Sequence, residues 1–118
     1  MTNPEFRIDG QTLKIGSDLS NAQSVKFSWP VIQVIPTNGS LVVRTEPAPG
    51  AGDNQNVCAI DESGKVVWTV KSRKHVYEDS PYTNVELKDG MLILYNWDGL
   101  RVIVNPQTWA EESAEYGR

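Results

Sequence analysis

The sequence predicts an all-β fold of about ten short antiparallel strands joined by hairpins. A polar residue precedes glycine at five points along the chain, beginning at Asp9, Asn38, Ser63, Asp89 and Asp98. Asp-Gly and Asn-Gly pairs favour the positive φ angles that two-residue hairpin turns require. The runs between these turns are rich in Val, Ile, Leu and aromatic residues and alternate with a period of two. Such strands form a barrel, a sandwich or a partial propeller-like stack.

The alternation defines the expected strands in chain order. One example is the run in which Val25, Phe27 and Trp29 share a face, while Lys26 and Ser28 point the other way. The same reading, applied from the N-terminus to the C-terminus, predicts strands at 5–8, 11–15, 24–29, 31–36, 40–46, 56–61, 65–71, 83–88, 91–96 and 100–105.

Three features interrupt or end this pattern. Pro30 separates two predicted strands and should mark a bulge, an edge or a corner, because proline cannot donate to a central ladder. Residues 46–56 predict a mobile loop and residues 72–82 a charged one. The tail is the best helical candidate, with Thr108 as its cap. Neither loop is long enough to link domains, so residues 1–118 are expected to form one all-β domain.

Composition and charge limit the classes of protein. Hydrophobic content of 39% and charged content of 22% are typical of an ordinary globular domain. No apolar run approaches the length of a membrane span, and no secretion signal is visible. The single cysteine and the net charge of -4 favour a cytoplasmic, acidic protein that binds no nucleic acid. An acidic surface suits a basic partner, although the charge also serves solubility.

The residues that most often carry chemistry are sparse. Cys58 lies mid-strand on the face of Ile60, where a buried and inert thiol is expected. His75 is the one histidine and lies in a charged loop, so we expect it to face solvent. One cysteine and one histidine exclude thiolate zinc clusters and multi-histidine metal sites, and no cofactor motif occurs. Trp29 and Trp68 fall on apolar faces and are expected in the core.

The chain also contains an internal near-repeat. A polar-glycine turn, an apolar strand and a second strand ending in Asp or Asn occur twice, with Gly39 and Gly90 51 residues apart. Self-similarity near this period is characteristic of propeller blades. The segment "NVCAIDESGKVVWTV" resembles a blade of the quinoprotein-type, pyrroloquinoline-quinone-like propeller, through Ala59, Asp61, Gly64, Lys65 and Trp68.

A second segment, "RVIVNPQTW", resembles the same part of that repeat. Asn105 stands in the position of the Asp, but Trp109 stands where the family usually has glycine. The resemblance implies a strand layout with room for two to three blades. It implies no cofactor site, because the residues that hold the quinone lie on other blades.

Two functions from different classes fit these features. The first is a non-catalytic protein-binding domain, similar in size and charge to bacterial immunity proteins, which neutralise a basic toxin by capping it. Its expected contact residues are Tyr77, Glu78, Asp79, Tyr82, Tyr95, Trp97, Asp98 and Arg101. The alternative is a small-molecule-binding β-barrel or unusual small enzyme that uses His75 in a deep pocket. The Asp98-Gly99 pair is expected to make a hairpin turn, with Trp97 packed over the end of the core.

Overall fold

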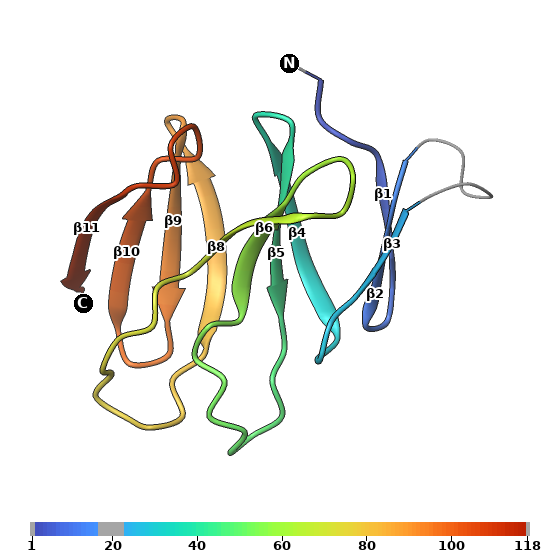
Figure 1. The fold of residues 1–118 in the computed structure, drawn as a ribbon. Helices are drawn as coiled ribbons and strands as arrows, with labels where there is room; N and C mark the ends of the chain where they lie inside the picture. The colour runs from blue at the N-terminus through green and yellow to red at the C-terminus, as the bar shows by residue number, and fades with distance from the viewer. Residues whose placement is uncertain (1, 17–22, 118) are drawn as a thin grey trace.

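A computed structural model describes residues 2–16 and 23–117, and these form eleven antiparallel strands and no helix. Three sheets stand side by side, from the N-terminal sheet at the right of Figure 1 to the C-terminal sheet at the left. None of the described residues forms a helix that could cross a membrane. The strands are β1 (Phe6–Asp9), β2 (Thr12–Ile15), β3 (Gln23–Lys26), β4 (Val31–Thr37), β5 (Ser40–Thr45), β6 (Val57–Ile60), β7 (Val66–Thr69), β8 (Tyr82–Lys88), β9 (Met91–Asn96), β10 (Leu100–Val104) and β11 (Glu111–Tyr116).

Each sheet is a meander of neighbouring strands. Sheet A has the order β1-β2-β3, sheet B the order β4-β5-β6-β7, and sheet C the order β11-β10-β9-β8. Sheet B lies in the middle, because one core joins it to sheet A and a second core joins it to sheet C. The described strands therefore form an open stack of three sheets and not a closed barrel.

Ten of the eleven strands coincide with the predicted runs, within a few residues at their ends. In β10 the alternation matches burial, because Leu100, Val102 and Val104 are buried and Arg101 is exposed. It does not hold throughout, because Val66 of β7 and Leu87 of β8 are exposed. Pro30 lies at the corner where the chain leaves sheet A for sheet B. The predicted strand at 24–29 ends early, at Lys26.

The helix expected in the tail is wrong. Residues 111–116 form the edge strand β11, which pairs with β10 along its length. The hydroxyl of Thr108 caps no helix; it accepts a hydrogen bond from the N–H of Ala110, at 3.2 Å. Pairing with an existing strand edge outweighs the weak helical preference of a few glutamates, since β propensity depends mainly on the neighbouring strand.

Sheets B and C repeat one geometry. The bounds of β4 and β8 differ by 51 residues, and each strand carries a bulge two residues from its start. The β4–β5 turn has Asn38 at φ 49° and Gly39 at φ 79°, and the β8–β9 turn has Asp89 at φ 52° and Gly90 at φ 78°. Both are the polar-glycine hairpin turns that the sequence predicts, because both central residues need positive φ.

The second halves of the two sheets share another turn. Asp61 Oδ1 accepts the N–H of Ser63, and Asn105 Oδ1 accepts the N–H of Gln107, each at 2.9 Å. Trp109, which occupies the glycine-like position of the repeat, has a φ of 62°. Left-handed backbone at a bulky residue is strained, so packing must hold it.

The indole of Trp109 stacks on Trp68 of β7, with ring centroids 5.3 Å apart. This stack joins sheet C to the edge strand of sheet B and supplies the packing that holds the strained backbone. Trp68 is half-buried and packs against the core shared by sheets B and C, whereas half-buried Trp29 belongs to neither core, so the prediction that they lie in the core is wrong for Trp29. The indole N–H of Trp29 donates to Asp53 instead, at 2.8 Å.

The first strands of sheets B and C are joined through one side chain. Gln33 in β4 donates from Nε2 to the carbonyl of Val85 at 2.7 Å and accepts the N–H of Val85 at 3.1 Å. The amide therefore satisfies both backbone groups of Val85, as a neighbouring strand would. Its Nε2 also reaches Asn84, the residue equivalent to Gln33 in the repeat.

Candidate functional site

The turn between β9 and β10 is the hairpin turn that the sequence predicts. The N–H of Gly99 donates to the carbonyl of Asn96 at 3.0 Å, and Gly99 has a φ of 93°. The side chain of Asn96 also accepts the N–H of Asp98, at 3.0 Å. This local chemistry fixes the direction in which Trp97 and Asp98 leave the turn.

The carboxylate of Asp98 is the centre of a buried hydrogen-bond cluster. Its Oδ1 accepts the N–H of Leu100 at 3.0 Å. Its Oδ2 lies 3.0 Å from Nδ1 of His75 and accepts the N–H of Val76 and the hydroxyl of Tyr116, each at 3.1 Å. Because a carboxylate only accepts, Nδ1 of His75 must carry the proton. Three separate segments of the chain therefore meet at one side chain.

The expectation that His75 faces solvent is wrong. Its side chain is 1% exposed and that of Asp98 is 0% exposed. The sequence gives no sign of this pair, because 23 residues separate the two positions. Only the docking of the 70–81 loop against the β9–β10 turn brings them together.

These contacts shift the pKa of Asp98. Burial alone would raise it, but hydrogen bonds from the N–H groups of Leu100 and Val76 and from His75 and Tyr116 outweigh burial, so the pKa lies below its usual value. Burial, together with the bond to Asp98, raises the pKa of the Tyr116 phenol. Asp98 is therefore ionised under ordinary conditions and holds its four donors as an anion.

The four most exposed large hydrophobic side chains of the described residues all adjoin this cluster. Trp97 is 66% exposed, Val76 62%, Tyr77 57% and Tyr116 55%. The expectation that Trp97 packs over the end of the core is therefore wrong. We call these four side chains the Trp97 surface. Asp98 follows Trp97 in the chain and accepts hydrogen bonds from the backbone of Val76 and the hydroxyl of Tyr116.

Side chains tie the adjoining loops to one another at the end of the molecule shown at the bottom of Figure 1. Asp79 accepts the N–H groups of Gly50 at 2.8 Å and Gly52 at 3.2 Å. Asn54 donates to the carbonyl of Glu78 at 2.7 Å and accepts the N–H of Ser80 at 2.7 Å. The 46–56 loop, predicted to be mobile, is thus held against the 70–81 loop.

Two buried asparagines complete these ties. Asn56 donates to the carbonyls of Thr45 and Tyr82 and accepts the N–H of Tyr82, at 2.8 to 2.9 Å. Asn96 donates to the carbonyl of Ser80 at 2.8 Å. Sequence reasoning missed both asparagines, because an Asn next to a loop is usually read as a turn residue.

The structure divides the eight residues predicted to contact a partner into three groups. Tyr77, Glu78, Asp79 and Trp97 lie on the joined loops and the turn. Tyr82 is 1% exposed and Asp98 is buried, so neither can contact a partner. Tyr82 lies in the core, and Asp98 accepts hydrogen bonds from Val76 and Tyr116 of the Trp97 surface.

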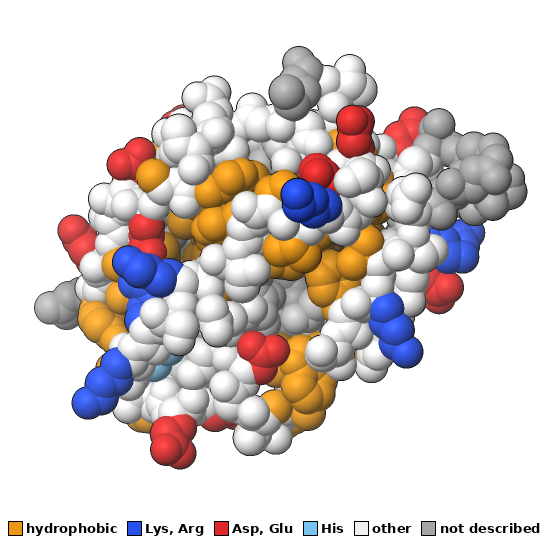
Figure 2. All heavy atoms as spheres, in the orientation of Figure 1, with side chains coloured by type: hydrophobic (Ala, Val, Ile, Leu, Met, Phe, Trp, Pro, Cys, Tyr) orange, Lys and Arg blue, Asp and Glu red, His pale blue; other side chains and the backbone are white. Residues whose placement is uncertain are grey.

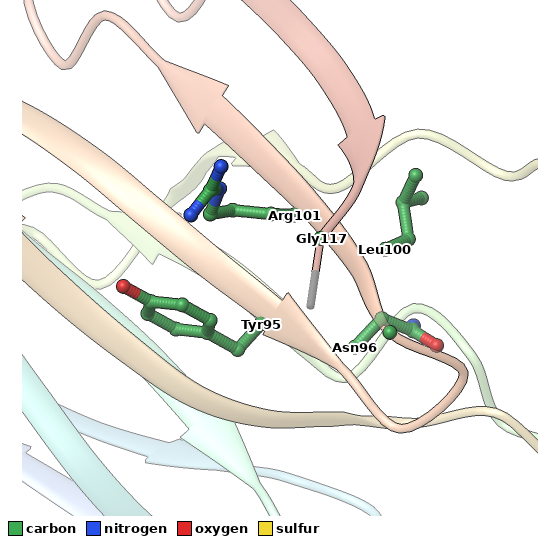
Figure 3. Close-up of a pocket in the computed structure, with 6 residues that line it drawn as sticks. Tyr95, Asn96, Leu100, Arg101 and Gly117 are labelled. Atoms are coloured by element: carbon green, nitrogen blue, oxygen red, sulfur yellow. The ribbon is translucent and has the colours of Figure 1, made fainter.

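Tyr95 and Arg101 form the third group. They lie opposite each other on β9 and β10 and leave the sheet on the same side, as Figure 3 shows. They border a shallow hollow of about 170 Å³. Leu94 and Val102, the next pair in register, point into the core. The hollow therefore lies on the outer face of sheet C.

A larger hollow, of about 280 Å³, lies beside Trp97. Figure 2 shows hydrophobic side chains and acidic residues together at this lower end of the molecule. Trp97 comes from the β9–β10 turn. The rest of the lining comes from the 46–56 loop and from the C-terminal end of the 70–81 loop, and hydrogen bonds join these two loops. The lining residues are Glu46, Pro47, Ala48, Pro49, Asp79, Pro81 and Trp97.

The alternative site, a deep pocket at His75, has weaker geometry. Five hollows have defined linings in the described residues, and His75 belongs to none of them. Nε2 of His75, Nε of Arg73 and the hydroxyl of Tyr82 are buried without a hydrogen-bond partner among those residues. Arg73 does form an ion pair with Glu111.

Two further sequence expectations concern metals and thiols. Within residues 2–16 and 23–117, no three His, Cys, Asp or Glu side chains gather to hold a metal. Cys58 is half-buried, and burial raises the pKa of its thiol to about 11. The thiol is therefore protonated near neutral pH, which agrees with the expectation that it is inert.

Comparison with known protein families gives one match. The profile of a family described as "Domain of unknown function (DUF7957)" matches residues 2–116. The matched range includes all eleven strands and every residue of the Trp97 surface. No curated protein matches the chain.

Proposed function

We propose a function for this chain, which belongs to the DUF7957 family: it is a non-catalytic, cytoplasmic β-domain that binds another protein through the Trp97 surface. The partner is basic, such as a toxin domain that the bound chain caps and neutralises.

One observation supports this proposal above the others: the four most exposed large hydrophobic side chains gather around one buried carboxylate. Scattered exposed apolar residues are normal, but a concentration of them is typical of an interaction site. Trp and Tyr are also the side chains that most often dominate binding energy. Here two tyrosines and a tryptophan are concentrated at a single end of the molecule.

The surface is also held in place before any partner binds. Asp98 ties Val76 and Tyr116 directly, and Trp97 precedes it in a hydrogen-bonded turn. A surface that is ordered in advance loses little conformational entropy on association. The buried polar cluster therefore has a clear use, which is to present apolar side chains in fixed positions.

Charge supports a basic partner. The net charge is -4, and Glu46, Glu78 and Asp79 lie on the loops beside Trp97. Arg44 lies close enough to Glu46 to act on it, but Glu78 and Asp79 belong to no ion pair found in the described residues. Opposite charge speeds encounter and selects against acidic partners.

Affinity capture from extracts of the native host tests the proposal. The tagged wild-type chain should retain one basic protein at equal stoichiometry, and the activity of that protein should fall when the chain is added. The variant Trp97→Ser should lose it. Leu87→Ser is the matched control, because Leu87 is 42% exposed on β8, away from the Trp97 surface.

Retention of the same protein by Trp97→Ser would contradict the assignment of the surface. Reproducible failure of the wild-type chain to capture any protein, across salt concentrations and growth conditions, would contradict the proposed function itself.

A further inference from the structure

We propose that the hollow beside Trp97 is a subsite for an arginine side chain of the partner protein. This inference rests on the proposed function and adds the chemistry of the group that is recognised. The hollow has a volume of about 280 Å³ and combines an exposed indole, three prolines and two carboxylates.

The walls suit a flat cation. Trp97 is 66% exposed, so much of its ring is open to a ligand. Pro49, which is exposed, and Pro81, which is half-buried, supply apolar surface that the methylene groups of a long side chain can cover. A guanidinium group stacks on an aromatic face, gains cation–π attraction and is less strongly hydrated than an ammonium group. Trp is the best aromatic partner for this interaction.

The charged residues that line the hollow are all acidic. Its two charged lining residues are Glu46 and Asp79. The ion pairs found in the described residues are Arg73 with Glu111 and His75 with Asp98, so neither carboxylate of the hollow belongs to one. Glu46 does lie close enough to Arg44 to act on its pKa. Asp79 is therefore the better candidate for pairing with an incoming cation.

Asp79 keeps the capacity to accept further hydrogen bonds. Each of its oxygens takes one backbone N–H, from Gly50 and from Gly52. A carboxylate has about four lone-pair directions, so each oxygen can accept one more donor. The two amides also fix the carboxylate in place, and the forked donors of a guanidinium match such a carboxylate.

The hollow is formed before binding. The N–H of Trp97 donates to the carbonyl of Pro81 at 2.9 Å, which joins two of its walls. Asp79 joins the wall of Pro47 and Pro49 to the 70–81 loop through Gly50. An arginine side chain therefore enters a site whose loops need no reordering.

Titration with small amides tests the assignment on the isolated chain, without the partner. The probes are N-acetyl-arginine amide, the neutral isostere N-acetyl-citrulline amide, and N-acetyl-lysine amide. We expect the arginine probe to shift the indole N–H resonance of Trp97 saturably in ¹H–¹⁵N NMR spectra, with a dissociation constant of about 1–10 mM. Citrulline should bind at least about tenfold more weakly, because it lacks the charge.

Variants locate the site. Binding to the variants is followed at the backbone N–H resonances of Gly50 and Gly52, which adjoin Asp79 and are present in every variant. Trp97→Leu, which keeps an apolar side chain, and Asp79→Asn should each weaken the arginine probe about tenfold or more. Glu62→Gln is the control, because it removes the same charge in the turn between β6 and β7 and should leave binding unchanged. Amide spectra report whether each variant is folded. If Asp79→Asn unfolds, Trp97→Leu and Glu46→Gln decide the outcome.

Equal binding of arginine and citrulline, absence of any shift at Trp97, or tighter binding of the lysine probe would overturn the inference. Its failure can be separated from failure of the proposed function. If Trp97→Ser loses the partner but no arginine probe binds, the surface is correct and the arginine subsite is wrong. If the probe binds at Trp97 but no partner is captured, the subsite is correct and the proposed function is wrong.

Discussion

Nδ1 of His75 lies 3.0 Å from Oδ2 of Asp98, and the two side chains are 1% and 0% exposed. Two polar groups that the sequence places in separate exposed loops thus form a buried pair. The pair joins the 70–81 loop to the β9–β10 turn and positions Trp97 and Val76 above it. It is a positioning element, because it contacts the backbone beneath the proposed binding surface and does not reach solvent.

Replacement of Asp98 by Asn should destabilise the fold. Asn has one acceptor oxygen, so its NH2 group would face either the donors of His75, Val76 and Tyr116 or, in the other orientation, the N–H of Leu100. Leaving a buried donor without its acceptor costs about 1–3 kcal/mol in the free energy of unfolding. Urea denaturation followed by tryptophan fluorescence measures this loss.

Asp89→Asn provides the matched control. Asp89 is exposed in the β8–β9 turn with a φ of 52°, which Asn adopts readily. We expect its free energy of unfolding to change by less than about 0.5 kcal/mol. Equal stability of the Asp98→Asn and Asp89→Asn variants would show that the Asp98 cluster contributes nothing.

The lowered pKa of Asp98 predicts how stability depends on pH. A carboxyl group with a lower pKa in the folded state than in the unfolded state stabilises the fold above its unfolded pKa of about 4. That contribution is lost as the pH falls below this value and through the folded pKa. The pKa of Asp61 is also lowered, by hydrogen bonds from the Ser63 hydroxyl and the backbone of Lys65 and Ser63, and contributes with the same sign.

The midpoint temperature of thermal unfolding of the wild-type chain should therefore decrease as the pH is lowered from 5 to 2. It should fall less steeply in Asp98→Asn, in which only Asp61 and the remaining acids titrate. Parallel pH profiles for the two proteins would contradict the assigned role of Asp98.

Alanine at two glycines should have unequal effects. Gly64 and Gly90 have φ angles of 85° and 78°, so alanine is strained at both, by about 1–2 kcal/mol. A Cβ at Gly64 would also lie 2.9 Å from Cγ2 of Val25 in sheet A, whereas nothing lies within 4 Å at Gly90. Overpacking adds about 1–3 kcal/mol.

Thermal or urea unfolding should therefore show a larger loss of stability for Gly64→Ala than for Gly90→Ala. Equal losses would indicate that sheet A does not pack against the β6–β7 turn.

The stack of Trp68 on Trp109 should appear as coupling in a double-mutant cycle. Each single change to alanine is expected to cost about 2–3 kcal/mol of unfolding free energy, less than for a fully buried Trp. The double variant should cost about 1 kcal/mol less than the sum. Additive losses would contradict a direct contact.

A second comparison isolates the backbone strain at Trp109. Because its φ is 62°, Trp109→Gly should be about 1 kcal/mol more stable than Trp109→Ala, the reverse of the usual order.

Local sequence chemistry was sufficient for the strands and turns. Period-two alternation located ten strands, and the Asn38-Gly39 and Asp89-Gly90 pairs adopt the predicted positive φ angles. These features depend on residues adjacent in the chain, because side-chain period and turn geometry are properties of a few neighbouring peptide units. The β11 strand was missed because its structure depends on the free edge of β10.

Sequence reasoning selected Trp97 and the 77–79 segment as candidate contacts, and the structure leaves Trp97 and Tyr77 exposed. It misplaced His75, Asp98 and Tyr82, whose burial depends on which loops meet at one end of the sheets. Contacts between positions 22 to 26 residues apart leave no periodic signal in the chain.

The sequence by itself determined that this chain is an all-β domain of hairpins with two similar halves and an acidic surface. Only the tertiary structure decided that Trp97 is exposed, that the side chain of His75 is buried, and that Trp97 and residues 46–49 line one hollow with two carboxylates. The physical reason is the range of the interactions. Strand and turn preferences act between neighbours, whereas burial and hydrogen bonding in the Asp98 cluster arise only after the 70–81 loop, the β9–β10 turn and the end of β11 have been brought together.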